Sequence, residues 1–453
     1  MMLKKNDQVE IVIEDIGSEG EGIGKYEGYT LFVKDTVMGD KALVQVMKTG
    51  KTYGYARLIR LLQPSEYRVE PRCPIAARCG GCQLQHVDYH KELEYKEQKV
   101  RNCLLRIGGF TEIEMEPISG MDDPWYYRNK SQFPVGRNKD GSIAIGFYAT
   151  RTHSIIDTER CYIGAEVNIK VLEFLRTFIE EYKIEPYQED NHNGLLRHIL
   201  TRVGYQTGEI MVCLVINGTD IPHKDKLVEG LTKIEGMKSI CLNVNKEKTN
   251  VILGSKVIPV WGEPYITDKI GEVSYRISPL SFYQVNPVQT KKLYDIALDY
   301  ANLTGDEVVW DLYCGIGTIS LFLAQKAKQV YGVEIIPQAI EDARKNAEIN
   351  HIHNARFYVG AAEDVLPRAY KEDKIYADVI VVDPPRKGCD QTLLDTILAM
   401  APKRVVYVSC DPATLARDLK YLCEKDYKLE KVRAVDQFSH SVHVETVALL
   451  VRV

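Results

Sequence analysis

A cysteine behind an apolar run near the C-terminus is the best-placed nucleophile in this chain. Cys410 ends the segment VVYVSC, which is typical of a buried strand, and Asp411 and Pro412 fit the cap and first position of a following helix. A thiol at this point faces a helix N-terminus, whose partial positive charge favours the reactive thiolate. An isolated cysteine at the end of a strand is more often a packing residue than a nucleophile. Whether Cys410 reacts therefore depends on the residues around it.

A glycine turn followed by an acidic residue predicts a nucleotide-type site. The segment VVWDLYCGIGTISLFLA reads as a strand, a tight turn at Gly315 and Gly317, and the start of a helix. Glu334 ends the next strand, about 20 residues later, where it can accept hydrogen bonds from ribose hydroxyls. The third glycine of a dinucleotide motif is missing, since Thr318 and Ser320 follow the turn. The pattern therefore favours S-adenosylmethionine over NAD.

A third apolar strand ends in a stiff acidic turn, DPPRKG. The two prolines fix the backbone behind Asp383, at the edge where open α/β sheets bind ligands. Enzymes that methylate an exocyclic amine through a similar turn place an aromatic residue after the prolines, to stack on the base. Arg386 stands there instead, which favours a carbon atom as the methyl acceptor.

Methylation of a uracil carbon explains the need for both a thiol and a base. C5 of uracil is a poor nucleophile, so a thiolate must first add at C6, and a base must later remove the C5 proton to release the thiolate. Glu445 suits that task, because the alternation in VHVET is typical of a strand with one buried face. His440 and His443 are rival bases that the sequence does not rank.

A second group of cysteines has the spacing of a metal site. Cys73, Cys79 and Cys82 stand in CPIAARCGGC, and Cys161 lies far downstream. Three thiolates in a glycine-bearing loop with a distant fourth could hold zinc or an iron–sulfur cluster, and the spacing does not choose between them.

The elements that must position these residues fall into three regions. Residues 1–62 carry short β-type runs separated by glycine-rich turns, which predicts a small barrel of the OB-like kind. Residues 63–270 read as an α+β region that contains the four cysteines, with a helix near 90–110 that could pack on the catalytic domain. Residues 271–453 alternate strand and helix, which predicts a doubly wound, Rossmann-like domain.

Composition indicates a globular protein of the cytoplasm. The chain has 453 residues, a net charge of −5 and 11 cysteines, which suits several domains in a reducing compartment. It contains no apolar stretch long enough to cross a membrane, and its first residues lack the apolar core of a signal peptide. The segment WYYRNKSQFPVGRNK mixes aromatic and basic residues as an RNA-contacting surface does.

Across nearly its whole length the chain resembles the bacterial RNA uracil-5-methyltransferase family. The matching strings are SFYQVNP, DLYCGIGT, GVEI, DPPRKG, SCDPATLARD and HVE. The nearest branch carries an N-terminal TRAM barrel and a 4Fe-4S cluster and acts on 23S ribosomal RNA. The segment VDQFSHSVHVE departs from the family by carrying Ser439 where proline is usual, and leaves Glu445 in register.

The resemblance implies roles for individual residues. Cys410 would be the nucleophile and Glu445 the base, and Cys73, Cys79, Cys82 and Cys161 would hold the cluster. The implied S-adenosylmethionine contacts are Gln284, Tyr313, Gly315, Glu334 and Asp383. The expected RNA contacts are Arg128, Lys130, Phe133 and Arg137, with help from Arg151, Arg197 and Arg202.

The expected activity is conversion of an unpaired, flipped-out loop uridine of 23S ribosomal RNA to 5-methyluridine by a monomeric enzyme. Methylation of a transfer-RNA uridine is the alternative within the enzyme class, and the barrel and the four cysteines weigh against it. An RNA-binding or ribosome-assembly factor without turnover is an alternative of another class, which the pairing of Cys410 with Glu445 opposes. An iron–sulfur electron carrier is a third.

Overall fold

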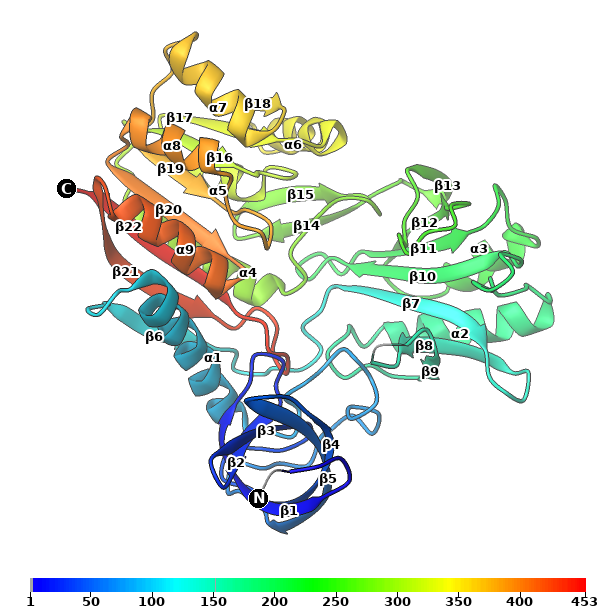
Figure 1. The fold of residues 1–453 in the computed structure, drawn as a ribbon. Coiled ribbons are helices and arrows are strands. Elements are labelled where there is room, and N and C mark those ends of the chain that lie inside the picture. Colours follow the sequence, from blue (N-terminus) through cyan, green and yellow to red (C-terminus); the bar gives the residue numbers. More distant parts are fainter. Residues whose placement is uncertain (1–2, 151) are drawn as a thin grey trace.

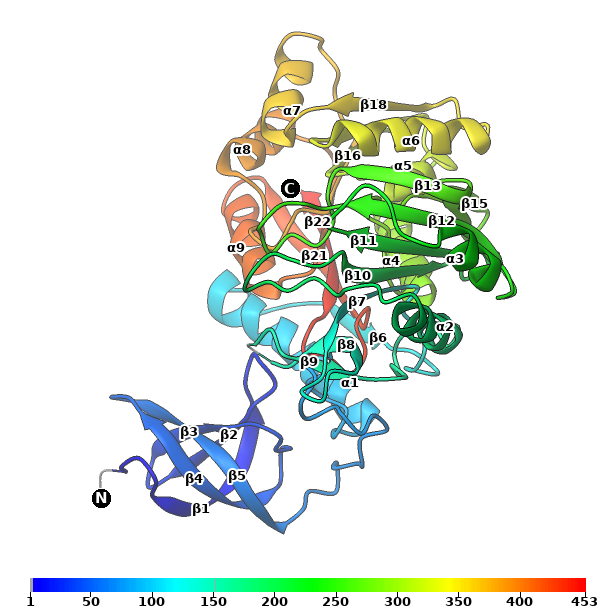
Figure 2. The same ribbon diagram turned by 90° about the vertical axis from the view of Figure 1, so that its right-hand side faces the viewer.

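The computed structural model describes residues 3–150 and 152–453, which form three regions (Figures 1 and 2). The first region is a closed barrel with strand order β1-β2-β3-β5-β4. Its strands are β1 (Gln8–Ile16), β2 (Gly22–Tyr26), β3 (Tyr29–Val33), β4 (Lys41–Thr49) and β5 (Tyr53–Gln63). Alternate residues such as Ile11, Ile13 and Val44 fill the barrel interior. The predicted N-terminal barrel is confirmed.

The central region is a mixed seven-stranded sheet with two helices packed against it. The strand order is β13-β12-β11-β10-β7-β8-β9. The strands are β7 (Lys130–Arg137), β8 (Ile143–Tyr148), β9 (Ile155–Asp157), β10 (Leu196–Val203), β11 (Ile210–Ile216), β12 (Met237–Val244) and β13 (Lys256–Gly262). Helices α2 (Asn168–Glu181) and α3 (Lys224–Leu231) share one apolar core with the sheet, as expected of an α+β domain.

The C-terminal region is built on an eight-stranded sheet of order β18-β17-β16-β19-β20-β22-β21-β6. Five neighbouring strands are parallel: β18 (Ala355–Val359), β17 (Gln329–Glu334), β16 (Val308–Leu312), β19 (Val379–Val382) and β20 (Arg404–Ser409). Strand β22 (Glu445–Arg452) runs antiparallel between β20 and β21 (Tyr427–Val435).

Helices cover both faces of this sheet. One core includes side chains of α4 (Pro287–Ala301), α5 (Thr318–Ala324) and α6 (Pro337–Ile349). The other includes side chains of α7 (Ala362–Lys371), α8 (Gln391–Met400) and α9 (Pro412–Cys423). This two-faced cover is the predicted doubly wound arrangement.

The structure moves two of the predicted domain limits. Strand β6 (Met115–Ser119) pairs with β21 and so extends the C-terminal sheet, although it lies within the predicted central region. The hairpin of β14 (Ile266–Ile270) and β15 (Val273–Ile277) packs into the core under α4 and α5, and the predicted limit at residue 270 would cut it. The pairing of β6 with β21 joins residues far apart in sequence, which a local pattern does not reveal.

Helix α1 (Tyr89–Cys103) connects the barrel to the C-terminal region. A π-helical turn (Leu104–Gly108) continues it, and Gly109 ends it at φ 77°. The wider turn changes the helical register, and Ile107 is 43% exposed. The helix packs on α9, as the sequence suggested. Among the described residues, no helix has both the length and the apolar character needed to cross a membrane.

Candidate active site

The parallel strands deliver four predicted residues to one edge of the sheet. Tyr313 directly follows β16, Glu334 ends β17, Asp383 follows β19, and Cys410 follows β20. The carboxyl ends of neighbouring parallel strands meet at the same edge, so these four residues gather although they are far apart in sequence.

Glu445 reaches the same edge from the opposite direction. Strand β22 is antiparallel to β20, and Ser409, the last residue of β20, pairs with Thr446. The first residue of β22 therefore lies beside the residue that follows β20. This pairing brings Glu445 next to Cys410.

One cavity of about 870 Å³ joins the predicted nucleophile, base and cofactor residues. Its lining includes Gln284, Tyr313, Gly315, Glu334, Asp383, Cys410 and Glu445. The predicted nucleophile, the base Glu445 and the implied cofactor contacts thus border a single space.

The glycine turn at the end of β16 has the conformation that its sequence predicts. Gly315 and Gly317 adopt φ of 55° and 82°, and a Cβ added to Gly317 would lie 3.2 Å from that of Ala343. The Glu334 carboxylate accepts hydrogen bonds from the backbone N–H groups of Gly315 and Ile336, at 3.2 and 3.0 Å. These bonds hold the carboxylate at the cavity edge, and its remaining lone pairs are available to a ligand.

Asp383, Glu445 and Arg386 influence one another's charge in the cavity. Burial raises the pKa of Asp383 well above its ordinary value. Burial, followed by the charge of Asp383, does the same to the pKa of Glu445, while the Arg386 guanidinium lowers it in part. Protons are therefore retained here at pH values where exposed carboxyl groups are ionised.

The net pKa shift of Cys410 is opposite in direction to the one expected from the helix end alone. Burial, then the charges of Glu445 and Asp383, raise the pKa of Cys410 to about 11, although Arg386 lowers it in part. The Asp411 carboxylate accepts hydrogen bonds from the N–H groups of Ala413 and Thr414 and so caps the helix N-terminus. The predicted cap and the proline at the first helical position are confirmed.

The structure separates the two histidines that were rival bases. The His440 ring stacks on Trp125 with centroids 4.0 Å apart, lies 3.4 Å from a Glu92 oxygen, and does not border the cavity. His443 does border it, and burial, followed by Arg386 and two lysines, lowers its pKa and favours the neutral imidazole. The base therefore has two candidates left, Glu445 and His443.

The four predicted cluster cysteines line a second cavity, of about 310 Å³. Cys73, Cys79, Cys82 and Cys161 border it, and the Gly81 N–H donates to the Cys79 sulfur at 3.4 Å. Among the residues in 3–150 and 152–453, no three His, Cys, Asp or Glu side chains converge as ligands of a single ion would.

Two of the four expected RNA contacts line the cysteine cavity. Arg128 borders both cavities, and Lys130 borders the cysteine cavity. Burial, followed by the charges of Arg202 and Arg128, lowers the pKa of Lys130 to about 8. The stacking role expected of Phe133 is wrong, because this side chain is fully buried in the central core. Arg137 is exposed and pairs with Glu185 at 3.1 Å, outside both cavities.

The additional arginines do not support RNA contact either. Arg197 is buried and donates to the carbonyl oxygens of Asn245 and Glu247. Arg202 is buried and donates to the Ser281 carbonyl. Both guanidiniums therefore serve the fold, and Arg151 lies outside the described residues.

Sequence reasoning missed several residues of the cavity wall. Phe282 is 71% exposed at the cavity, and its place inside the SFYQVNP motif was the available signal. Phe438 also lines the cavity, as do Gly80 and Gln83 from the cysteine loop. No local pattern indicated that the cysteine loop forms part of the catalytic wall, since the two segments meet only in the folded chain.

Comparison with known proteins agrees with this geometry. Residues 88–453 match the family model described as tRNA (uracil-5-)-methyltransferase, and residues 3–59 match the TRAM domain. An uncharacterized RNA methyltransferase of Clostridium tetani is 50% identical over 449 residues, covering 99% of this chain and 97% of its own. A relative in Halalkalibacterium halodurans with the same description is 52% identical over 99% of this chain and 98% of its own.

A solved structure is similar over the whole length. It is the Pyrococcus abyssi tRNA (uracil-54, C5)-methyltransferase in complex with S-adenosyl-L-homocysteine, with a TM-score of 0.78 and 31% identity, covering 98% of this chain and 99% of that one. Because the family model spans most of the chain and both relatives align end to end, this protein belongs to the RNA (uracil-5-)-methyltransferase family and carries an N-terminal TRAM domain.

Proposed function

We propose that this enzyme uses S-adenosylmethionine to methylate C5 of a uridine in 23S ribosomal RNA. One observation carries the proposal: Cys410 and Glu445 border the same cavity as the glycine turn and Glu334. A nucleophile, a base and a nucleotide-type site are the three parts that carbon methylation of uracil requires.

The residues present fit S-adenosylmethionine. The Gly315 turn allows close backbone approach, Glu334 offers acceptors to ribose hydroxyls, and the related Pyrococcus enzyme was solved with S-adenosyl-L-homocysteine. When bound, S-adenosylmethionine supplies a methyl group on a sulfonium. Tyr313, Gln284 and Asp383 complete the proposed binding site.

Cys410, at the end of β20, and Glu445, at the start of β22, carry out the protein's part of the proposed reaction. In the reacting state Cys410 is a thiolate and Glu445 a carboxylate, and the protons of both have passed to solvent. The Cys410 sulfur forms a bond to C6 of the uracil, and the C5–C6 electron pair moves to C5 and the neighbouring carbonyl. After C5 has gained the methyl group, Glu445 accepts the C5 proton. The C6–S bond then breaks, which restores the double bond and releases the thiolate. Arg386 is the cation that lowers the pKa of both Cys410 and Glu445.

A 4Fe-4S cluster fits the cysteine cavity better than zinc does. Each cysteine of a cubane binds a different iron, so its sulfurs lie farther apart than the ligands of one ion. The cavity is also bordered by Arg128, Lys130 and Arg160, which would offset the negative charge of a thiolate-ligated cluster. Since Gly80 and Gln83 of the same loop line the catalytic cavity, we propose that the cluster has a structural role there.

Transfer RNA is the second candidate substrate. The Pyrococcus enzyme named for a tRNA uridine aligns with 98% of this chain, so the TRAM barrel does not separate the two substrate classes. The resemblance of the motifs and the four cysteines to the ribosomal-RNA branch is what favours 23S ribosomal RNA.

The experiment that tests the function uses RNA containing 5-fluorouridine. Because the base cannot remove fluorine from C5, an addition–elimination enzyme should be trapped as a covalent adduct that migrates slowly on a denaturing gel. Fragments of 23S ribosomal RNA should give the band, and the same band with tRNA alone would move the substrate to the second candidate. Absence of a band with both RNAs, from folded protein that carries its iron, would contradict the methyltransferase mechanism.

A further inference from the structure

The loop that joins β21 to β22 forms the wall of the catalytic cavity beside the base. This β21–β22 loop, residues 436–444, leads directly into Glu445 and places Phe438, Ser441 and His443 along the cavity. The Phe438 and His443 rings meet edge to face, with centroids 6.2 Å apart. The position of these rings therefore depends on what holds the loop.

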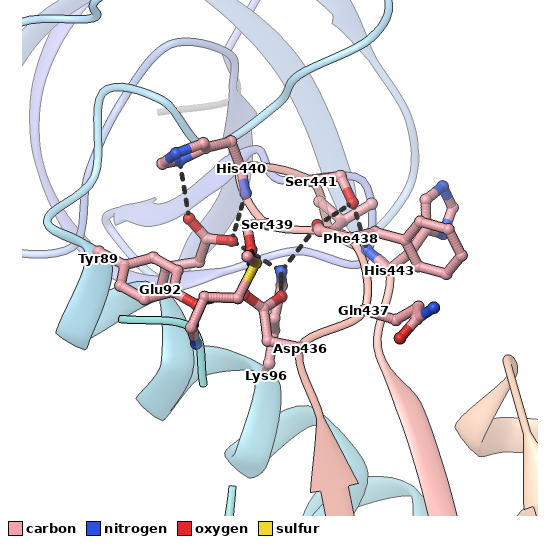
Figure 3. A network of polar contacts seen from close by, with 12 residues as sticks. Tyr89, Glu92, Lys96, Asp436, Gln437, Phe438, Ser439, His440, Ser441 and His443 are labelled. Carbon is pink, nitrogen blue, oxygen red and sulfur yellow. Dashed lines mark hydrogen bonds and ion pairs between the residues drawn. The ribbon is translucent and has the colours of Figure 1, made fainter. Parts of the chain in front are cut away.

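A fully buried lysine of helix α1 holds the loop from behind, as Figure 3 shows. Lys96 Nζ lies 2.5 Å from Asp436 Oδ1 and 2.7 Å from Glu92 Oε1. It also donates to the Phe438 carbonyl oxygen at 3.1 Å. One ammonium group thus uses its three donors on α1 and on two residues of the loop.

Further hydrogen bonds around Lys96 also hold the β21–β22 loop in place. The Tyr89 hydroxyl and the Ser439 hydroxyl each donate to Asp436 Oδ2 at 2.6 Å. The His440 backbone N–H donates to Glu92 Oε1 at 2.7 Å. Ser439 stands where the family usually has proline, so in this chain a hydrogen bond to Asp436 accompanies the loss of the proline ring constraint.

The buried charges of Lys96, Glu92 and Asp436 oppose movement of the β21–β22 loop away from α1. Although burial lowers it, the charges of Glu92 and Asp436 raise the pKa of Lys96 above its ordinary value, so the ammonium form persists. Leaving a buried ion without its partner strongly destabilises a fold. Moving the β21–β22 loop away from α1 would leave such ions unpaired, which opposes motion of Phe438.

We propose that Lys96 is a positioning residue for methyl transfer, which fixes the β21–β22 loop so that Phe438 and His443 hold the target uracil between Cys410 and Glu445. The inference rests on the proposed function. Lys96 does not border the catalytic cavity and touches none of the residues at the glycine turn. Its removal should therefore slow the reaction of the bound uridine without weakening cofactor binding.

The test is a charge-balanced pair, Lys96→Met with Glu92→Gln, in the full-length enzyme. Glutamine keeps an acceptor for the His440 N–H, and the pair removes one positive and one negative charge. We expect kcat for methylation and the rate of 5-fluorouridine adduct formation to fall at least tenfold, with the Kd for S-adenosylmethionine within twofold of wild type. Lys91→Met is the matched control, because Lys91 lies on the same helix and pairs with the exposed Glu94.

Each result decides the matter. A folded double variant with kcat within twofold of wild type overturns the proposal, and so does an equal loss of kcat and cofactor affinity, which indicates general destabilisation. Should the double variant not fold, Tyr89→Phe removes one donor to Asp436 and keeps every charge, and it should lower kcat about threefold with cofactor affinity unchanged. If the wild-type enzyme forms no adduct, the proposed function is contradicted, and the role of Lys96 is contradicted with it. If the wild-type enzyme is active and the variant is equally active, only the role of Lys96 is contradicted.

Discussion

Cys410 follows the last residue of β20, and Glu445 is the first residue of β22, the antiparallel neighbour of β20. The two side chains therefore share one edge of the sheet and influence each other, since the charge of Glu445 raises the pKa of Cys410. A nucleophile that attacks C6 and a base that acts on C5 must sit close together, because these carbons are bonded. The antiparallel pairing of β20 with β22 supplies that proximity.

Replacing the nucleophile should abolish chemistry and spare cofactor binding. Cys410→Ala removes the sulfur that we propose adds to C6, so we expect methylation to fall more than about 10³-fold. The Kd for S-adenosylmethionine, measured by calorimetry, should stay within twofold, because the glycine turn and Glu334 are untouched. Loss of cofactor binding in this variant would instead indicate a folding defect.

Replacing the base should stall the reaction after methyl transfer. In Glu445→Gln the C5 proton has no carboxylate to accept it, so unsubstituted RNA should accumulate as a covalent adduct with Cys410. A denaturing gel with methyl-labelled cofactor should show labelled RNA moving with the protein. If Glu445→Gln turns over normally and His443→Gln stalls, the base is His443.

Local patterns predicted the parts of the fold whose partners are close in sequence. The strand, glycine turn and helix around Gly315 and the cap at Asp411 were both correct, because each depends on a few neighbouring residues. The addition of β6 to the sheet was missed, since its pairing with Val432 joins segments from opposite ends of the chain. Length and alternation identify a strand, but they do not identify its partner.

In the candidate site, too, the residues that local patterns could predict differ from those that depend on long-range packing. Residues at strand ends, such as Asp383 and Glu334, were placed correctly because the edge of a parallel sheet collects them. Lys96 and Glu92 look in sequence like an ordinary exposed pair four residues apart on a helix. In the folded chain they are fully buried and Lys96 pairs with Asp436 of the β21–β22 loop, a contact that no pattern within the helix indicates.

Removing Arg386 from the cavity wall should shift the pH dependence of the reaction. Arg386 lowers the pKa of both Cys410 and Glu445, so both groups should hold their protons more tightly in Arg386→Gln. In a plot of single-turnover rate against pH, the rising limb should shift to higher pH by about one unit. An unchanged limb with a lower plateau would mean that Arg386 binds RNA rather than tuning these groups.

Losing one cysteine of the second cavity should remove iron and disturb the catalytic wall. Burial makes the Cys161 thiol a weak acid unless a metal holds its thiolate, because it raises the pKa of that thiol. In Cys161→Ser, purified under anaerobic conditions, we expect iron content and visible absorbance to be lost, together with a lower melting temperature. Cys423→Ser is the control, since Cys423 ends α9 and does not border that cavity. A single zinc per wild-type chain would contradict the cluster.

The buried base should make the fold less stable as pH rises. The pKa of Glu445 is raised in the folded state relative to its ordinary value of 4.5, so the folded protein keeps a proton that the unfolded chain releases. Below the ordinary pKa of 4.5, Glu445 is protonated in both the folded and the unfolded state, so the free energy of unfolding does not change with pH through this group. As pH rises from there to the raised pKa, the free energy of unfolding falls by about 1.4 kcal/mol per pH unit, and it levels off once the folded state ionises. Glu445→Gln lacks this proton, so its melting temperature should exceed that of wild type by a margin that grows between pH 5 and neutrality. A margin that is constant with pH would show that the carboxyl group titrates normally in the folded protein.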